Sequence, residues 1–478
     1  MSIETKIKNA VLVGLQLPKM STQELDGSLQ ELTRLVTTLG YNVVGQLTQK
    51  RSTYRAAAVL GEGKLKELAE WTGGTGKIAS MVDRKITKAE AKRIEEAGAD
   101  EDAGAEDADA DEENFEAEDE AVAEAGALTE DQKGSAQIVI VDSDLSPSQL
   151  RNLESATGVT VLDRTGVIIE IFSRHARTRA ARLQVEIAKL TYVAPRLRET
   201  GASEDRQGGG GKGAGESSLE LDKRKIRDRI KELKTELASI GNEHQIRRAR
   251  REQENCVALV GYTNAGKSSL MRAMTGSEVL VADKLFATLD TTIRPLYPES
   301  RPKVLVSDTV GFIKKLPHDL VASFKSTLDE ALHASLLLFV VDAADPSFRS
   351  QLEVTQSVLA EVGAKDIPSL LVLNKRDRLS EAEQTEIKNE FSDKRFSDTV
   401  MISTRNKDDL KLLRDKIMSY FESHMVDEDL FVPYSAKGVI GEIRARMRVL
   451  GETYDEKGVT LKVRGAPEAL AHVKKHLS

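Results

Sequence analysis

One eight-residue stretch limits what this chain can fold into more than any other, because it fits G-x-x-x-x-G-K followed by Ser. Loops of this pattern wrap nucleotide phosphates with backbone N–H groups. The apolar run at 256–260 predicts a buried strand before the loop, and 268–274 predicts a helix after it. That order directs a helix dipole at the phosphates. The predicted phosphate-binding residues are Gly261, Tyr262, Thr263, Asn264, Ala265, Gly266, Lys267 and Ser268.

Two side chains of this loop suggest the chemistry. Lys267 can reach the β- and γ-phosphates, and the Ser268 hydroxyl can bind Mg²⁺, which makes Ser268 a candidate metal ligand. An ordinary glycine turn is the alternative, and the flanking strand and helix patterns disfavour it.

Three further motifs follow in the order that a GTPase requires. A D-x-x-G motif ends an apolar strand, where Asp308 can hold Mg²⁺ through water and the N–H of Gly311 can meet the γ-phosphate. An N-K-x-D motif then places a carboxylate, Asp377, that can accept from N1–H and the exocyclic amine of guanine, whereas adenine offers neither donor in that geometry. A third motif stands where such domains present S-A-K, with Thr404 replacing the small residue. The predicted residues are Asp308, Thr309, Val310 and Gly311, then Asn374, Lys375, Arg376 and Asp377, then Ser403, Thr404 and Arg405.

A candidate first switch lies between the phosphate loop and the D-x-x-G motif. A hydroxyl there must close on Mg²⁺ while the γ-phosphate is present and release it after hydrolysis. Thr288 is the preferred metal ligand, with Thr291 and Thr292 as alternatives. The residues assigned to nucleotide binding in this segment are Phe286, Ala287, Thr288, Leu289 and Asp290.

No catalytic residue can be assigned from the sequence. Phe312 stands where Ras-like enzymes place a water-orienting Gln, so we expect slow intrinsic hydrolysis that another group stimulates. Asn264 is similar to a residue that helps bind K⁺ in some GTPases of the tRNA-modification class, which predicts K⁺ as a second cofactor. An Asn264 side chain that bonds its own backbone is the alternative.

Composition bounds the class of protein. A chain of 478 residues should form about two to four domains, and no apolar run reaches the length of a membrane span. The single cysteine, Cys256, cannot form an internal disulfide and is expected on a buried strand. The N-terminal segment does not resemble a secretory signal, so we expect a cytoplasmic protein.

Charge is divided unevenly along the chain. Eighteen Asp and Glu residues and no Lys or Arg lie between Ile94 and Gln132. Removing these eighteen charges from the net charge of −8 leaves +10, which suits a polyanionic partner such as RNA but also suits an ordinary solubilising surface. The acidic segment, residues 97–132, is expected to be a disordered insert because it offers little apolar surface to bury.

The fold class is predicted as α/β, with four parts. Residues 1–175 form an N-terminal α/β domain that the acidic insert interrupts, with strands near 10–15, 42–47 and 137–141 and helices near 25–38, 63–71 and 147–153. Residues 255–424 form a P-loop domain with a doubly wound sheet, whose strands are expected at 256–260, 304–307, 335–341, 369–373 and 399–402. Residues 425–478 form a small α+β domain with helices near 441–449 and 467–476 and a strand at 459–463.

Residues 176–254 are predicted to form an antiparallel helical hairpin. The apolar residues follow a spacing of threes and fours, as in a coiled-coil seam: Leu183, Ile187, Leu190, Ala194 and Leu197, then Leu219, Ile226, Ile230, Leu233, Leu237 and Ile240. Residues 201–215 join the two helices through a glycine run that is longer than a turn needs. A flexible basic tip that meets a phosphate-rich surface and a disordered linker are both open at this point.

The chain resembles the HflX family of ribosome-associated GTPases. The residues that carry the likeness are 162–169, 208–216 with Leu219 and Glu220, the phosphate loop, 286–290 and 308–312. The resemblance implies a GTPase that binds the 50S subunit near its peptidyl-transferase region, splits stalled or idle 70S ribosomes or acts in ribosome biogenesis, and has a secondary ATPase activity. It also implies that the hairpin tip contacts ribosomal RNA through Gly208, Gly209, Gly210, Gly211, Lys212 and Gly213.

The sequence departs from the family pattern at the tip and leaves other functions open. Residues 212–217 read KGAGES where the family has R-G-P-G-E-T, so the rigidity of the tip can differ. A signalling GTPase with only protein partners is the main alternative, and a tRNA-modifying GTPase is disfavoured because Cys256 is the only cysteine. We expect a monomer.

Overall fold

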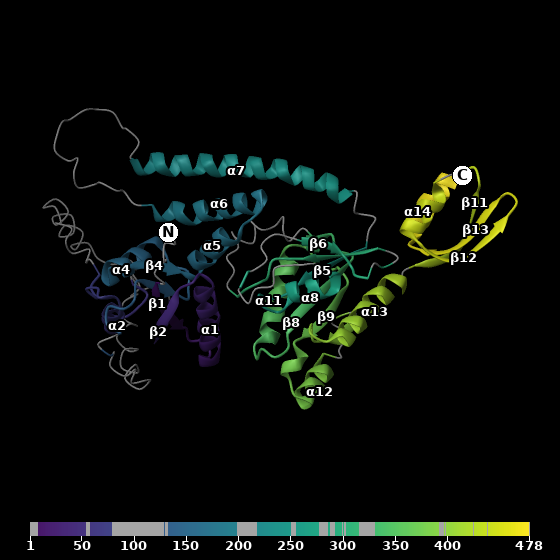
Figure 1. Cartoon of the computed structure of the whole chain (residues 1–478). Coiled ribbons are helices and arrows are strands. Elements are labelled where there is room, and N and C mark those ends of the chain that lie inside the picture. Colours follow the sequence, from purple (N-terminus) through teal and green to yellow (C-terminus); the bar gives the residue numbers. More distant parts are fainter. Residues whose placement is uncertain are drawn as a thin grey trace, which may run out of the picture. The chain divides into compact units, whose positions relative to one another are not determined.

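A computed structural model describes residues 8–53, 58–78, 129, 132–197, 218–249, 255–276, 285–286, 292–298, 300, 303–314, 330–391, 396, 398–423, 425–436 and 438–477 (Figure 1). The chain divides into two compact units, residues 1–168 and 169–478. Within the described ranges, no helix is both long and apolar enough to cross a bilayer.

The N-terminal unit is built on a four-stranded parallel sheet of order β2-β1-β3-β4. All four residues of the short strand β3 are apolar and buried, as expected where helices cover both faces of a parallel sheet. The strands are β1 (Asn9–Gln16), β2 (Asn42–Lys50), β3 (Ile138–Val141) and β4 (Thr160–Asp163). The helices are α1 (Thr22–Thr38), α2 (Glu62–Thr72), α4 (Pro147–Thr157) and α5 (Arg164–His175), the last of which continues into the second unit.

A buried ion pair lies where β4 passes into α5. The side chain of Arg164 is 1% exposed, and its guanidinium lies 2.6 Å from both Asp142 and Glu31. Ser28 also donates a hydrogen bond of 2.5 Å to Asp142. Because a buried charge is costly without its partner, these contacts make Arg164 a structural residue of this unit.

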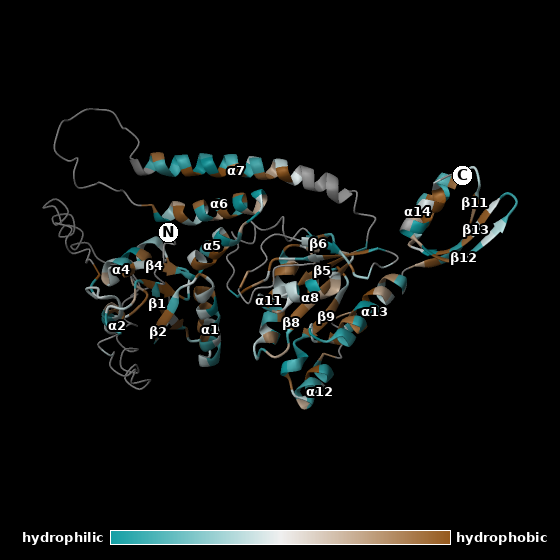
Figure 2. Ribbon diagram, viewed as in Figure 1, coloured by the Kyte–Doolittle hydropathy of each residue, from teal (hydrophilic) through white to brown (hydrophobic). Residues whose placement is uncertain are grey.

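The helical hairpin consists of α6 (Arg179–Val193), a 3-10 turn η3 (Ala194–Arg196) and α7 (Ser218–Ala249). Its antiparallel direction follows from two ion pairs, because Arg179 contacts Glu236 and the later residue Glu186 contacts the earlier residue Arg229. The predicted seam forms the apolar contact: Leu183, Ile187 and Leu233 are buried, with Leu190, Ile230, Leu237 and Ile240 packed beside them. Outside this seam, the part of α7 that Figure 2 colours by hydropathy is mostly hydrophilic.

The first helix of the hairpin is shorter than its apolar spacing predicts. The seam was extended through Ala194 to Leu197, whereas α6 ends at Val193. Pro195 explains the difference, because proline lacks the N–H that would continue the α-helical hydrogen bonds, and the chain passes into the 3-10 turn η3.

The P-loop domain contains a six-stranded sheet of order β10-β9-β8-β5-β7-β6. The predicted doubly wound arrangement is confirmed for its parallel strands, and the antiparallel edge strand β6 was not predicted. The strands are β5 (Asn255–Val260), β6 (Thr292–Pro295), β7 (Val304–Asp308), β8 (Leu336–Asp342), β9 (Ser369–Asn374) and β10 (Asp398–Met401). The described helices are α8 (Lys267–Thr275), α11 (Phe348–Glu361), η4 (Arg376–Arg378), α12 (Glu381–Glu390) and α13 (Lys407–Ser423).

The last three described strands form a small antiparallel sheet of order β11-β13-β12, as the predicted α+β class requires. Its elements are β11 (Val426–Pro433), α14 (Val439–Arg446), β12 (Arg448–Asp455), β13 (Gly458–Gly465) and α15 (Pro467–Leu477). The helix predicted over 441–449 is wrong at its end, because Arg448 and Val449 belong to β12. Pairing with β13 places them there and overrides their local helical pattern.

Several expectations are not decided by this fold. The acidic insert lies outside the described residues except for Thr129 and Gln132, and the glycine tip lies outside them entirely. The four domain limits therefore stay predictions. Cys256 lies on β5 as expected but is only partly buried.

Candidate nucleotide-binding site

The four predicted motifs meet at one edge of the six-stranded sheet. The phosphate loop follows β5, the D-x-x-G motif begins at the last residue of β7, and the N-K-x-D motif begins at the last residue of β9. Residues 403–405 follow β10. Because these strands are parallel, their carboxyl ends lie on the same side, where open α/β sheets bind ligands.

The two loop glycines are required by close backbone approaches. A Cβ on Gly261 would lie 2.1 Å from the carbonyl oxygen of Val340, and Gly261 has φ +153°. A Cβ on Gly266, which has φ +98°, would lie 2.3 Å from Nδ2 of Asn374. Only glycine fits both positions without displacing a neighbour.

Lys267 is the buried cation of the loop. Its side-chain ammonium donates to the carbonyl oxygens of Gly261 at 3.0 Å and Tyr262 at 2.8 Å. Burial lowers the pKa of Lys267 to about 8, and the nearby Asp308 carboxylate partly opposes that shift. The structure thus concentrates a positive charge inside the loop, where a phosphate group would stabilise it.

Hard oxygen donors gather beside this cation. The Ser268 hydroxyl donates to Oδ2 of Asp308 at 2.7 Å, and Asp308 is fully buried. Mg²⁺ prefers oxygen ligands and usually takes only one or two from the protein, keeping waters and substrate phosphates for the rest. The Ser268 hydroxyl and the Asp308 carboxylate therefore fit a Mg²⁺ ion.

The D-x-x-G segment is bonded directly to the phosphate loop. Thr263 N donates to the carbonyl of Phe312 at 2.8 Å, and Phe312 N donates to the carbonyl of Gly261 at 3.1 Å. The Phe312 side chain is 2% exposed, so it is packed into the protein. This agrees with the expectation that residue 312 does not orient a water molecule.

On the base side, one lysine joins two loops. Lys375, in the left-handed conformation at φ +63°, donates to the carbonyl of Asn264 at 2.8 Å and to Asp342 at 2.6 Å. Asn374 donates to the carbonyl of Ala265 at 2.9 Å. The N-K-x-D motif therefore supports the phosphate loop as well as the expected base site.

Asp377 has the charge that guanine recognition needs. A hydrogen bond from the Ser403 hydroxyl holds the pKa of Asp377 below its ordinary value, and the Arg405 guanidinium 3.8 Å away lowers it further. The carboxylate is therefore ionised at neutral pH. Its side chain is 35% exposed, which leaves it open to a ligand.

Comparison with known proteins decides the family. Family models match over most of the chain: "GTP-binding GTPase N-terminal" at 26–99 and 118–173, "GTP-binding GTPase Middle Region" at 175–251, and "50S ribosome-binding GTPase" at 256–375. The GTPase HflX of Gluconacetobacter diazotrophicus is 54% identical over 481 aligned residues, covering 100% of both chains. The chain belongs to the HflX family of GTPases.

Two other proteins are also similar to this chain. The GTPase HflX of Caldanaerobacter subterraneus is 36% identical, with 95% of this chain and 90% of that protein covered. A solved GTP-binding protein from Sulfolobus solfataricus in complex with GDP is 22% identical, with 86% and 98% covered and a TM-score of 0.42. The full-length HflX relative and the family model over 256–375 show that the chain is a GTPase, as its motifs predict.

Two carboxylates of the site were missed by the motif search. Asp409, in the first turn of α13, accepts from Ser403 N at 2.8 Å and from Arg376 at 2.6 Å, so it holds the two base-side loops together. Asp342, at the end of β8, anchors Lys375. Only Asp342 offered a signal in the sequence, because it directly follows the strand predicted at 335–341, whose end forms the site, whereas Asp409 lies in the first turn of a helix, where acidic residues are ordinary.

The candidate switch is only partly described. Phe286 is buried and has φ +56°, whereas Ala287, Thr288, Leu289, Asp290 and Thr291 lie outside the described residues. Thr292 begins β6. The assignment of Thr288 as a metal ligand therefore stays a prediction.

Proposed function

We propose that this GTPase works on the 50S ribosomal subunit and uses its nucleotide state to split stalled or idle 70S ribosomes or to act in ribosome biogenesis. The single observation that carries the proposal is the convergence of four guanine-nucleotide motifs at one sheet edge of a chain with a full-length HflX relative. The model matched by residues 256–375, described as a 50S ribosome-binding GTPase, supplies the partner.

The phosphate end of the site is proposed to work through Lys267 and Ser268. Lys267 exchanges its two carbonyl contacts for β- and γ-phosphate oxygens, which keeps its ammonium charged in a buried position. Ser268 and Asp308 would hold Mg²⁺, Asp308 through water, with Thr288 as the proposed further ligand. When bound, the metal supplies charge neutralisation between the β- and γ-phosphate oxygens.

The base end is proposed to select guanine through Asp377. Its ionised carboxylate is proposed to accept from two guanine N–H groups. Ser403 N donates to Asp409 and Arg405 N donates to the Ser403 hydroxyl, so the backbone N–H of Thr404 is the proposed donor to the guanine carbonyl. An adenine base would leave the carboxylate without these donors, which explains a preference for guanine. The implied secondary ATPase activity would need a different site or a weaker mode of binding.

The catalytic group is proposed to come from outside this loop set, because Phe312 is buried and carries no polar atom. K⁺ near Asn264 is one proposed source. Asn264 has φ +61°, and its backbone carbonyl accepts a hydrogen bond from Lys375. The residue is exposed, so its side chain is accessible to an ion from solvent. Equal GTP turnover in Na⁺ and K⁺ buffers would remove this source.

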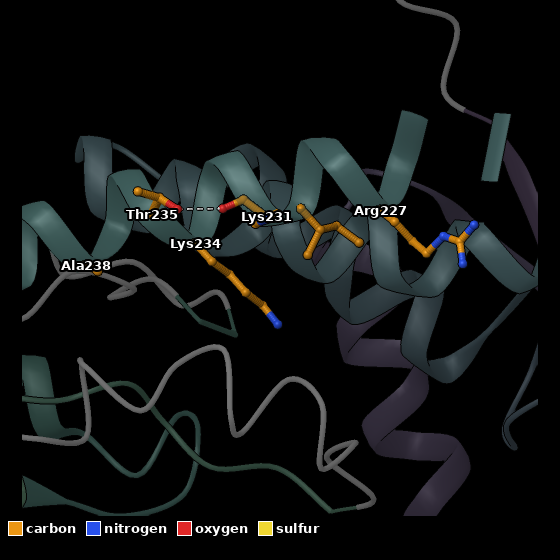
Figure 3. Close-up of a pocket in the computed structure, with 6 residues that line it drawn as sticks. Arg227, Lys231, Lys234, Thr235 and Ala238 are labelled. Carbon is orange, nitrogen blue, oxygen red and sulfur yellow. Dashed lines mark hydrogen bonds between the residues drawn. The ribbon is translucent and has the colours of Figure 1, made fainter. Parts of the chain in front are cut away.

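RNA contact is proposed for the hairpin. The tip residues Gly208 to Gly213 are one proposed contact. A second is an open groove of about 560 Å³ on α7, whose lining includes three cations, Arg227, Lys231 and Lys234 (Figure 3). Ile230, Thr235 and Ala238 complete the lining. Clustered cations on an open surface suit phosphate contacts.

Two measurements test the proposal against the signalling alternative. We expect the chain to sediment with 50S subunits in the presence of a non-hydrolysable GTP analogue, and 50S subunits to raise its GTP turnover strongly. Deleting residues 208–215 or replacing Lys231 and Lys234 with Ser should weaken sedimentation and make it less sensitive to salt. No sedimentation in either nucleotide state, with turnover unchanged by 50S subunits, would favour a protein-only partner.

A further inference from the structure

A cluster of three potential metal ligands lies in the C-terminal unit, outside the nucleotide site. Glu442 comes from α14, and His472 and His476 come from α15. A spacing of four residues places both imidazoles on the same face of α15. One ligand atom from each of the three side chains lies within 4.8 Å of the others, so a single ion can reach all three.

The distances within this cluster suit a shared cation better than a hydrogen bond. Nδ1 of His472 lies 3.3 Å from Oε1 of Glu442, and Nδ1 of His476 lies 3.5 Å from Oε2 of the same carboxylate. A charge-assisted hydrogen bond would be about 2.7–2.9 Å long. Two ligands of a tetrahedral zinc ion, each about 2.0–2.1 Å from the metal, are about 3.3–3.4 Å apart.

The His472 side chain is 37% exposed, but its Nδ1 atom, which faces the cluster, is buried. Nδ1 of His472 is a buried nitrogen without a hydrogen-bond partner in this structure, although it faces the Glu442 carboxylate. The His476 side chain is 50% exposed, so an ion can enter the cluster from solvent. Arg446 Nε lies 3.4 Å from Glu442 and is the neighbouring cation that a metal would have to displace.

We propose that Glu442, His472 and His476 form a binding site for a first-row divalent transition metal, with Zn²⁺ as the best match. Two imidazoles and one carboxylate are ligands that Zn²⁺ accepts, and water fills the fourth position. The ion ties α14 to α15, the two helices that pack over the core of Val432, Leu461 and Val463. Because these ligands include nitrogen, the site differs in chemistry from the oxygen-lined Ser268–Asp308 pair.

The test is a metal titration of the full-length chain, purified without a histidine tag and held in GDP with excess Mg²⁺. Mg²⁺ prefers oxygen ligands, so the excess occupies the nucleotide site and screens the acidic segment while leaving the imidazoles available. We expect Zn²⁺ to bind one equivalent in calorimetry. Co²⁺ should bind at the same site and give the visible d–d absorption of a four-coordinate ion.

Variants assign the ligands. His476→Ala, His472→Ala and Glu442→Gln should each weaken Zn²⁺ binding by at least about tenfold, the smallest loss seen even for outer-shell partners of a metal. His333→Ala is the matched control, since His333 is exposed in the P-loop domain and should bind no metal. Circular dichroism without metal checks that each variant is folded.

Two outcomes would overturn the proposal. One is the absence of Zn²⁺ binding above the Mg²⁺ background, which would leave Glu442 and the two histidines as an ordinary ion-paired surface. The other is equal loss of binding in His476→Ala and His333→Ala. Neither result depends on GTP turnover, so the ribosomal proposal stands or fails separately.

Discussion

The substitution Asp377→Asn tests guanine recognition most directly. It keeps the size of the side chain but replaces an ionised acceptor with an amide that has one acceptor and one donor group. Guanine needs two acceptors from this residue, for N1–H and for its exocyclic amine. Xanthine has a carbonyl oxygen where guanine has that amine, so the amide N–H of the variant can pair with it.

The expected loss can be worked from the site. Each hydrogen bond to a charged group contributes about 1.5–3 kcal/mol, so two contribute about 3–6 kcal/mol. Asp377 is 35% exposed and lies 3.8 Å from Arg405, so solvent and a neighbouring cation already satisfy part of its charge. We therefore expect the lower end, about 3 kcal/mol, or roughly a hundredfold weaker GDP binding.

Equilibrium titration with fluorescent GDP and XDP, in wild type and variant, measures this change. Asp377→Asn should lose GDP affinity and gain XDP affinity, which separates a changed base contact from a misfolded domain. Asp366→Asn, an exposed position away from the site, is the control and should change neither. Asp377→Asn with GDP affinity within threefold of wild type would refute the assignment of Asp377.

Three further outcomes are expected. Burial lowers the pKa of Lys267 to about 8, so this side chain loses its proton above that pH unless phosphates are bound. GDP binding above about pH 8 should therefore take up a proton, and its affinity should fall as pH rises. A binding enthalpy that does not depend on the buffer above that pH would contradict this. Arg164→Met leaves its two carboxylate partners uncompensated and should lower the free energy of unfolding by about 3–5 kcal/mol. Urea denaturation followed by the fluorescence of Trp71, the single tryptophan, measures this loss. A loss below about 1 kcal/mol would show that the ion pair is dispensable. Gly266→Ala would place a Cβ 2.3 Å from Asn374 Nδ2 at φ +98° and should weaken GDP binding by about tenfold or more, whereas unchanged binding would show that the loop can relax.

The nucleotide motifs were predictable because backbone geometry dictates their residues. Gly261 and Gly266 lie where a Cβ would clash with other atoms, so the glycine pattern in the sequence follows directly from the backbone geometry of the loop. The hairpin seam was predictable for the same reason, since Leu183, Ile187 and Leu233 must face one another to be buried.

Long-range contacts explain what the sequence did not reveal. Most residues of β12 are exposed, so the strand has no clear alternation of buried and exposed positions, and only pairing with β13 defines it. The role of Asp409 could not be predicted from the sequence either, because an acidic residue in the first turn of a helix is ordinary. Its contact with Ser403 N appears only when β10 and α13 are seen together.

The position of Lys375 has a consequence for how base preference can change over time. Its ammonium donates to the Asn264 carbonyl in the predicted phosphate loop and to Asp342 at the end of β8, while Lys375 itself stands in the motif predicted to recognise the base. Replacing Lys375 is expected to disturb both ends of the predicted nucleotide site, whereas replacing Asp377 is expected to change only the base end. If the base preference changed during evolution, we would therefore expect the substitution at Asp377 and not at Lys375, because a change at Lys375 would also alter the phosphate loop.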